Sequence, residues 1–292
     1  MNSFTIKDLE SLSGIKAHTI RIWEQRYGFI KPQRTATNIR YYSNDELKTL
    51  LNVSLLNKHG YKISKIDQMT AEQMQQSILS LPGSDAIQER LVNEMVHLMV
   101  ELQVNDVDSL LAEQIKLNGV EHTILELIFP FLERIGILWL TGHINPAQEH
   151  LITNLIRQKL LVAIENTSPS IRKSATALLF LPEGEYHEMG LLFLYYLLKS
   201  SGVLVYYIGA NAPISDVAYV VEAKKPTVIF THITSAGSKF SMEKFLDRIN
   251  KKIPNTSIVI TGLTTQQYKK PVPATVQFMK SLSEVKDYIS SL

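Results

Sequence analysis

The chain has 292 residues, of which 45% are hydrophobic and 20% are charged, and its formal net charge is +2. These values are typical of a soluble globular protein with ample core, and the length predicts two to three domains. No apolar run of about 18 residues and no basic-then-apolar leader is seen, which argues against a membrane span and a secretion signal and predicts a cytoplasmic protein. Cysteine is absent, so disulfides and thiolate metal sites are excluded, and any metal is left to His, Asp or Glu.

Charge is unevenly distributed along the chain. Residues 1–70 carry 11 Lys/Arg against 6 Asp/Glu, whereas the remaining residues carry 19 against 22. A small basic unit on a mildly acidic body is typical of a nucleic-acid-binding head, although a solvated basic surface without a partner gives the same imbalance.

The N-terminal segment begins with a predicted pair of short helices. Residues 5–12, TIKDLESL, start with Thr5 as a helix N-cap and place Asp8 at the third helical position, which is a capping-box pattern. A second helix is predicted in residues 16–28, KAHTIRIWEQRYG, after a tight turn. Such a pair is typical of a helix-turn-helix, whose second helix enters the major groove of DNA.

A wing and a longer helix are predicted next. Residues 33–42, QRTATNIRYY, are polar and basic with β-formers at their end, which predicts a hairpin or wing. An amphipathic helix then begins at Ser43 or Asn44 and runs to Gly60, and a short helix is expected in residues 62–69.

The second helix and the wing carry side chains suited to DNA. Arginine guanidinium and tyrosine hydroxyl groups can bind phosphates, while residues near the start of the second helix can reach base edges. The predicted base-edge residues are His18, Thr19 and Arg21, and the predicted phosphate contacts are Arg26, Arg34, Arg40, Tyr41 and Tyr42. Trp23 is expected in the core, and Glu24 is expected to pair with an arginine of the same domain.

From about residue 71 to residue 165 the chain is almost wholly helical in pattern. Apolar residues recur at three- and four-residue spacing in four segments. These predicted helices span residues 85–102, 106–117, 121–140 and 146–164. Their short links predict an antiparallel bundle, and the polar residues 165–174 predict a linker.

The pattern then changes to strands that alternate with helices. The predicted strands are residues 175–181, 203–208, 226–233, 256–261 and 275–279. The alternation predicts a parallel, doubly wound sheet with ligands at the carboxyl ends of its strands. The fold class is therefore multidomain α + α/β, with a winged helix-turn-helix head in residues 1–72, a four-helix bundle in 80–166 and a Rossmann-like sheet domain in 174–292.

Two segments of the head resemble a known family. HTIRIWEQRYG, residues 18–28, and IRYYS, residues 39–43, resemble the N-terminal domain of MerR-type transcription regulators. The resemblance implies binding to double-stranded DNA at promoter inverted repeats as a dimer. Many such regulators carry a long dimerisation helix after the head, whereas bundle sequence follows here, so self-association is expected to come from elsewhere.

The bundle and sheet together resemble a second pattern. Trp139 is separated by nine residues from Glu149-His150, and EYHEMG, residues 185–190, follows the first strand. This order resembles the cobalamin-binding half of the CarH-like photoreceptor repressors, which use adenosylcobalamin as a sensory cofactor. Taken alone, the bundle residues are also typical of a buried tryptophan and a capping glutamate.

The resemblance assigns roles to these bundle residues. It implies that Trp139, Glu149 and His150 cover the upper face of the cofactor. In light-responsive relatives a histidine that captures cobalt after photolysis follows the tryptophan, whereas this chain has Leu140. His143 is the nearest histidine that could substitute, so the resemblance supports cobalamin binding more strongly than a light response.

The sheet motif carries the expected metal ligand. In cobalamin domains Asp-x-His-x-x-Gly supplies the lower axial ligand in place of the cofactor's benzimidazole, and here it stands as Glu185-x-His187-x-x-Gly190. A neutral imidazole suits cobalt, and a carboxylate can accept its other ring N–H. By the resemblance His187 is the cobalt ligand and Gly190 leaves room for the nucleotide tail, whereas a histidine without a ligand at a helix start is the alternative.

Two later family motifs are altered in this chain. Ser-x-Leu after the third strand stands as Thr231-x-Ile233, which retains a hydroxyl group. Gly-Gly after the fourth strand stands as Thr261-Gly262, so Thr261 adds bulk where the backbone is expected to approach the ligand.

These features predict a cobalamin-binding transcription regulator, a repressor whose assembly as a dimer or tetramer responds to adenosylcobalamin and light. The cofactor is expected between bundle and sheet. One alternative is a MerR-type regulator that has lost cobalamin and acts through protein contacts. Another is a cobalamin-dependent enzyme, but no segment is left for a substrate domain and no nucleophile-base arrangement is found, so no enzymatic activity is expected.

Overall fold

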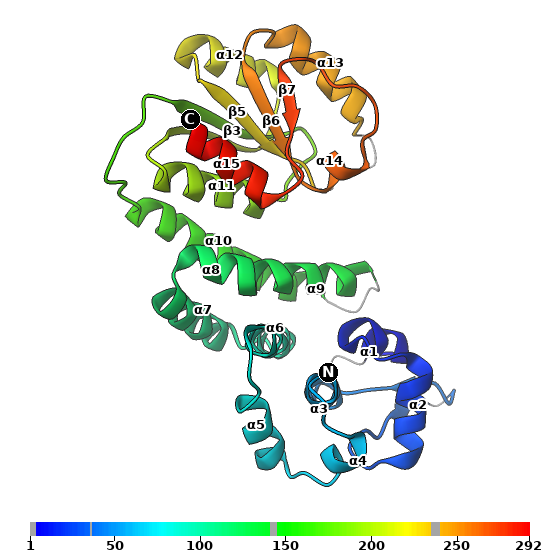
Figure 1. Cartoon of the computed structure of the whole chain (residues 1–292). Coiled ribbons are helices and arrows are strands. Elements are labelled where there is room, and N and C mark those ends of the chain that lie inside the picture. Colours follow the sequence, from blue (N-terminus) through cyan, green and yellow to red (C-terminus); the bar gives the residue numbers. More distant parts are fainter. Residues whose placement is uncertain (1–3, 36, 141–144, 235–239) are drawn as a thin grey trace. The chain divides into compact units, whose positions relative to one another are not determined.

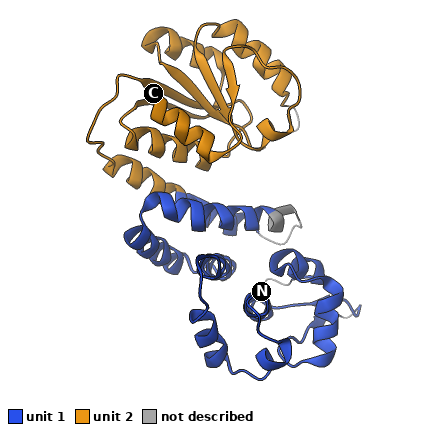
Figure 2. Cartoon of the chain, in the orientation of Figure 1, with its two compact units in different colours: residues 1–156 blue, residues 157–292 orange. Residues whose placement is uncertain are grey.

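The computed structural model describes residues 4–35, 37–140, 145–234 and 240–292, without the side chains of residues 137–140 (Figure 1). The chain forms two compact units, Met1–Ile156 and Arg157–Leu292 (Figure 2). The head and most of the predicted bundle belong to the first unit, and the sheet belongs to the second. Within the described residues, no helix combines the length and apolar character that a membrane span requires.

The head is a helix-turn-helix with a small wing, as the sequence predicts. Its elements are α1 (Ile6–Ser13), α2 (Ala17–Arg26), β1 (Gln33–Arg34), β2 (Arg40–Tyr41), α3 (Asn44–Lys58), α4 (Ile63–Ile66) and α5 (Ala71–Leu79). The predicted capping box is confirmed, because the Thr5 hydroxyl accepts from the Asp8 N–H while the Asp8 carboxylate accepts from the Thr5 N–H. A second capping box, of Ser43 with Glu46, starts α3.

The four predicted bundle helices are all present. They are α6 (Ser84–Val100), α7 (Val104–Asn118), the run formed by α8 (Val120–Thr123), η1 (Ile124–Ile128) and α9 (Phe129–Leu140), and α10 (Pro146–Asn166). The π-helical segment η1 has a local cause in Pro130, which lacks an N–H and whose ring would collide with the carbonyl group four residues earlier in an α-helix. The Phe129 N–H accordingly bonds the carbonyl of Ile124, five residues back.

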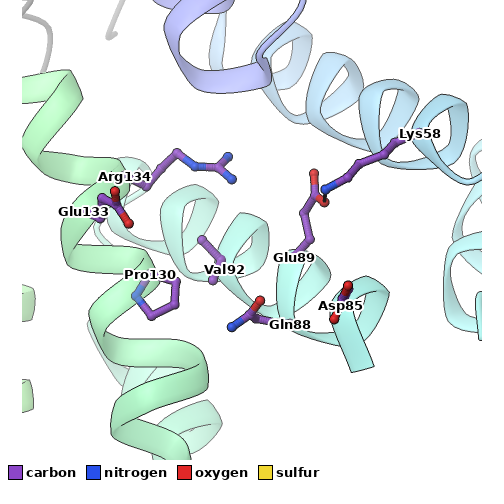
Figure 3. A pocket seen from close by; sticks show the side chains of 8 residues that line it. All are labelled: Lys58, Asp85, Gln88, Glu89, Val92, Pro130, Glu133 and Arg134. Atoms are coloured by element: carbon purple, nitrogen blue, oxygen red, sulfur yellow. Dashed lines mark hydrogen bonds and ion pairs between the residues drawn. The ribbon is translucent and has the colours of Figure 1, made fainter. Parts of the chain in front are cut away.

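Helix α9 also contacts the head within the first unit. Arg134 donates to the carbonyl oxygen of Leu12 at 2.8 Å and to Asn93 Oδ1 at 3.2 Å. Burial lowers the pKa of Arg134 below its ordinary value. Beside it lies a polar pocket in which Lys58 Nζ pairs with Glu89 Oε2 at 2.5 Å (Figure 3). Partly buried hydrogen bonds of Arg134 and an exposed Lys58–Glu89 ion pair thus join the head to the bundle.

The second unit is a doubly wound α/β domain, which confirms the predicted fold class. Its strands are β3 (Thr176–Pro182), β4 (Leu204–Ala212), β5 (Val228–His232), β6 (Ser257–Thr261) and β7 (Val276–Phe278). They are hydrogen-bonded in the order β4-β3-β5-β6-β7, and each neighbouring pair is parallel. The strand order reverses beside β3, and ligands of such sheets bind at this switch point.

Helices cover both faces of this sheet (Figure 1). They are α11 (Met189–Ser200), α12 (Ile214–Lys224), α13 (Met242–Lys252), the short α14 (Leu263–Gln267) and α15 (Leu282–Ser291). Helices α11 and α15 contact each other, as do α12 and α13. Strand β5 shows the alternation between the faces, because Phe230 packs on Tyr288 of α15 whereas Ile229 belongs to the core with α13 residues such as Phe245.

Candidate functional site

The predicted sheet residues gather at the carboxyl edge of the sheet. The loop after β3 carries Glu185 and His187, and α11 begins two residues later. The ends of β5 and β6, with His232 and Thr261 paired in register, lie beside this loop. The edge is the switch point of the doubly wound fold.

Glu185 is the central anchor of the loop. Its side chain is 0% exposed. Oε1 accepts from the N–H groups of Tyr186 and His187, each at 2.9 Å, and Oε2 accepts from the Thr234 N–H at 2.9 Å. The carboxylate therefore ties the β3–α11 loop to the end of β5.

His187 is held by the same carboxylate. Its Nδ1 lies 2.6 Å from Glu185 Oε1, and its side chain is 60% exposed. Because Nδ1–H donates to the carboxylate, the lone pair of the neutral ring lies on Nε2, the tautomer that suits a metal ligand. The longer glutamate in place of the family's aspartate thus makes the expected hydrogen bond.

The space beside Gly190 contains the ring of His232. A Cβ atom on Gly190 would lie 2.4 Å from His232 Nε2. The opposite ring nitrogen, Nδ1, lies 2.8 Å from Thr261 Oγ1. Burial lowers the pKa of His232 to about 4, so its ring is neutral at pH 7. The sequence predicts room for a nucleotide tail beside Gly190, and in this structure the imidazole of His232 lies there.

Thr231 and Ile233 lie on the other face of the sheet. Both are 0% exposed, and Ile233 belongs to the core formed with α12 and α13. Thr231 Oγ1 has no hydrogen-bond partner in the described part of the chain. The prediction that these two side chains line the cofactor site is corrected, because alternate strand residues point to opposite faces and His232 is the one directed to Gly190.

Gly262 serves the backbone at the end of β6. Its φ is +101°, and a Cβ atom there would lie 2.4 Å from the carbonyl oxygen of Ile233. The sequence predicts that the Thr261 side chain adds bulk toward a ligand. In the structure its hydroxyl group is instead directed to His232. Both residues therefore shape the site through contacts with the β5 end.

The structure shows one partly buried polar cluster beside the loop that was not predicted from the sequence. Glu188 Oε2 accepts from Arg157 Nε at 2.9 Å, and Oε1 accepts from the Tyr207 hydroxyl at 2.6 Å. Burial and the Glu188 carboxylate raise the pKa of Tyr207. The second acid of EYHEMG was the available signal, and its contacts hold the start of α11.

The predicted bundle residues lie in the first unit. Trp139 is in the last turn of α9, with its side chain outside the described residues, as is the whole of His143. Glu149 and His150 are in the first turn of α10, with side chains 26% and 68% exposed and 3.8 Å between Oε2 and Nδ1. The two polar side chains are thus accessible at one end of a helix.

The head presents most of its predicted DNA residues. His18, Arg21 and Arg26 are exposed on α2, and Arg34 is exposed on β1. Thr19 is partly buried, and the Tyr41 hydroxyl donates to Gln33 Oε1 at 2.6 Å.

Tyr42 is a correction to this set. It is 0% exposed and its hydroxyl donates to Glu24, so burial raises its pKa and leaves it no access to DNA. Two other expectations are confirmed, because Trp23 is 7% exposed and Glu24 Oε2 pairs with Arg40 Nε at 3.1 Å.

Comparisons with known proteins agree with this organisation. The family described as "MerR HTH family regulatory protein" matches residues 4–73, and the family described as "B12 binding domain" matches residues 88–163. The HTH-type transcriptional repressor CarH of Myxococcus xanthus is 28% identical over 89% of this chain and 88% of its own length. CarA of the same organism, also an HTH-type transcriptional repressor, is 27% identical over 91% and 89%.

Among solved structures, the monomethylamine corrinoid protein of Methanosarcina barkeri is similar in fold. The TM-score is 0.55 and the identity 14%, and the match covers 69% of this chain and 96% of that protein. The helices and strands of the matched part of this chain are thus arranged in a fold similar to that of a corrinoid protein.

Proposed function

We propose that this chain, a transcriptional regulator with a MerR-type helix-turn-helix domain and a B12-binding domain, represses transcription in response to adenosylcobalamin. The observation that carries the proposal is the imidazole of His187, fixed by the buried Glu185 carboxylate at the switch-point edge of the sheet. A histidine oriented in this way by a carboxylate is typical of a metal ligand. The similarity to two repressors over about nine tenths of the chain supports the regulatory role.

The residues of the loop would act together on the cofactor. Glu185 accepts the Nδ1–H of His187, which keeps the Nε2 lone pair available to cobalt and fixes the plane of the ring. By the family resemblance, Trp139, Glu149 and His150 would cover the opposite face. When bound, adenosylcobalamin supplies a cobalt–carbon bond that light breaks.

Regulation would follow from linkage between cofactor and assembly. A ligand shifts an equilibrium between states only by binding one of them more tightly. We propose that adenosylcobalamin favours the homo-oligomer, dimer or tetramer, that binds inverted repeats, and that illumination reverses this. The full-length relatives are repressors, and we propose that the chain performs no catalysis.

Absorbance spectroscopy and size-exclusion chromatography of the full chain with adenosylcobalamin, in the dark and after illumination, test this proposal. The expected result is co-elution of cofactor and protein, a changed spectrum and a changed elution volume. His187→Ala should lose the spectral change, because the imidazole that would bind cobalt is removed. His122→Ala, which removes an exposed histidine of α8, should behave like the unmodified chain.

The alternative function, a MerR-type regulator that acts through protein contacts alone, is favoured by one observation. The His232 ring lies beside Gly190, where a nucleotide tail was expected. A spectrum that is unchanged by the chain, with no co-elution, would contradict cobalamin binding and support this alternative.

The head should bind DNA with a steep dependence on salt. Exposed Arg34 on the wing is expected to contact a phosphate, and each phosphate contact contributes about 0.9 to the slope of log K against log salt concentration. Arg34→Ala should therefore reduce the slope by about 1. Titrations of labelled operator DNA at several salt concentrations measure this, with Lys251→Ala, at an exposed position of α13, as the control. An unchanged slope in Arg34→Ala would remove this residue from the DNA contacts.

A further inference from the structure

Gly190 and His232 form a contact that the proposed function does not use. Gly190 is the second residue of α11. A Cβ atom on it would lie 2.4 Å from Nε2, 2.5 Å from Cδ2 and 2.8 Å from Cε1 of His232. The His232 imidazole thus packs against the start of α11, in space that is open because Gly190 has no side chain.

The His232 ring is held in this position. Its Nδ1 is 2.8 Å from Thr261 Oγ1, on the neighbouring strand at the same register. The Thr261 hydroxyl also lies 3.4 Å from the carbonyl oxygen of Thr231. Displacement of the ring would break the hydrogen bond to Thr261 and remove the packing of the ring on Gly190. Both losses would lower the affinity for any ligand that needs the same space.

The position of the His232 ring can be compared with that of His187, the proposed cobalt ligand. His187 lies three residues before Gly190, at the loop that leads into α11, and His232 ends the strand next to β3. By the family resemblance, a corrinoid held by His187 would extend its nucleotide tail beside Gly190, toward the space between α11 and the sheet. The ring of His232 lies between these two elements.

We propose that His232 is a specificity-determining residue that disfavours corrinoids carrying a nucleotide tail. The inference rests on the proposed function, because it concerns how a corrinoid fits the His187 site. A tail enters beside Gly190 only after the imidazole has left Thr261, whereas a corrinoid without a tail binds with the ring in place. The ring therefore weakens the binding of cobalamin relative to that of a tail-less corrinoid.

The test compares two ligands on three forms of the full chain. Dissociation constants for adenosylcobalamin and for adenosylcobinamide, which lacks the tail, are measured by absorbance titration in the dark. His232→Ser should bind adenosylcobalamin about three- to tenfold more tightly, the range for one hydrogen bond that no longer has to break. Its affinity for adenosylcobinamide should change less than about twofold. Thr261→Val, which removes the partner of the ring, should shift affinity in the same direction by a smaller factor.

A second readout uses the unmodified chain. The imidazole NMR signals of His232, assigned by their loss in His232→Ser, should shift on addition of adenosylcobalamin and stay in place with adenosylcobinamide. Equal gains for both ligands, or no gain for either, would overturn the specificity role, as would His232 signals that adenosylcobalamin leaves unmoved. Absence of binding of either ligand to every form would instead overturn the proposed function, and the specificity role with it.

Discussion

Replacing Glu185 with leucine should lower the free energy of unfolding by about 3–5 kcal/mol, because three main-chain N–H groups and a histidine would lose one buried acceptor. The groups are the N–H of Tyr186, His187 and Thr234, each 2.9 Å from a carboxylate oxygen. Leucine is close to glutamate in volume, so the loss comes from unsatisfied donors rather than from a cavity. Calorimetric unfolding of the full chain measures the change.

Glu183 provides a matched control two residues earlier in the same loop. Its side chain is 51% exposed and pairs at 3.2 Å with Arg248, itself 60% exposed. Exposed ion pairs contribute little, so Glu183→Leu should change stability by less than about 1 kcal/mol. Equal losses from both variants would show that Glu185 acts as a surface charge rather than as the anchor of the loop. Glu185→Leu should also lose the spectral change expected with adenosylcobalamin, because the His187 ring would no longer be oriented.

Replacing Gly262 with alanine should also cost about 3–5 kcal/mol, because unfavourable backbone conformation and steric overlap add up. The φ of +101° is one that L side chains rarely adopt, and the added Cβ would lie 2.4 Å from the oxygen of Ile233. That carbonyl cannot easily withdraw, because it accepts from the hydroxyl of Thr264 at 2.8 Å while the Ile233 N–H donates to Thr261. Thermal unfolding of the full chain checks the result.

Gly184 separates the two contributions. Its φ is +85°, but nothing lies within 4 Å of the position that a Cβ would take. Gly184→Ala should therefore show only the conformational penalty, about 1–2 kcal/mol. If both alanine variants were destabilised equally, the steric overlap with the carbonyl oxygen of Ile233 would contribute nothing to the loss of stability.

Elements whose pattern is local were predictable from sequence. The capping box of Thr5 and Asp8 needs only neighbouring residues, and it forms as expected. The strands of the sheet contain short runs of branched residues, and their alternation with helices determines a parallel arrangement. The π-helical segment before Pro130 was not predicted, because apolar spacing alone does not distinguish α from π turns.

The direction of the side chains at the end of β5 is the main difference between the sequence-based prediction and the structure. The Thr231 hydroxyl was matched to a family serine by residue type, whereas the structure directs His232 to Gly190. A shift of one residue in a strand moves a side chain to the opposite face, and a single sequence carries no local signal that decides between two adjacent polar residues. Tyr42 failed for the same reason, since its neighbour Tyr41 is on the accessible side of the wing and Tyr42 is in the core.

The carboxylate of Glu24 has a consequence for DNA recognition by the head. From α2 it accepts from Arg40 Nε, in the second wing strand, and from the hydroxyl of Tyr42, directly after that strand. Helix α2 and the wing, which would contact different parts of a DNA duplex, are therefore held in a fixed relative orientation. Their relative orientation is settled when the head folds, so little conformational entropy is lost on meeting an operator. Arg40, one of the two wing arginines, is thereby held inside the head, and exposed Arg34, which donates to Asn38, is the other wing arginine that could contact a phosphate.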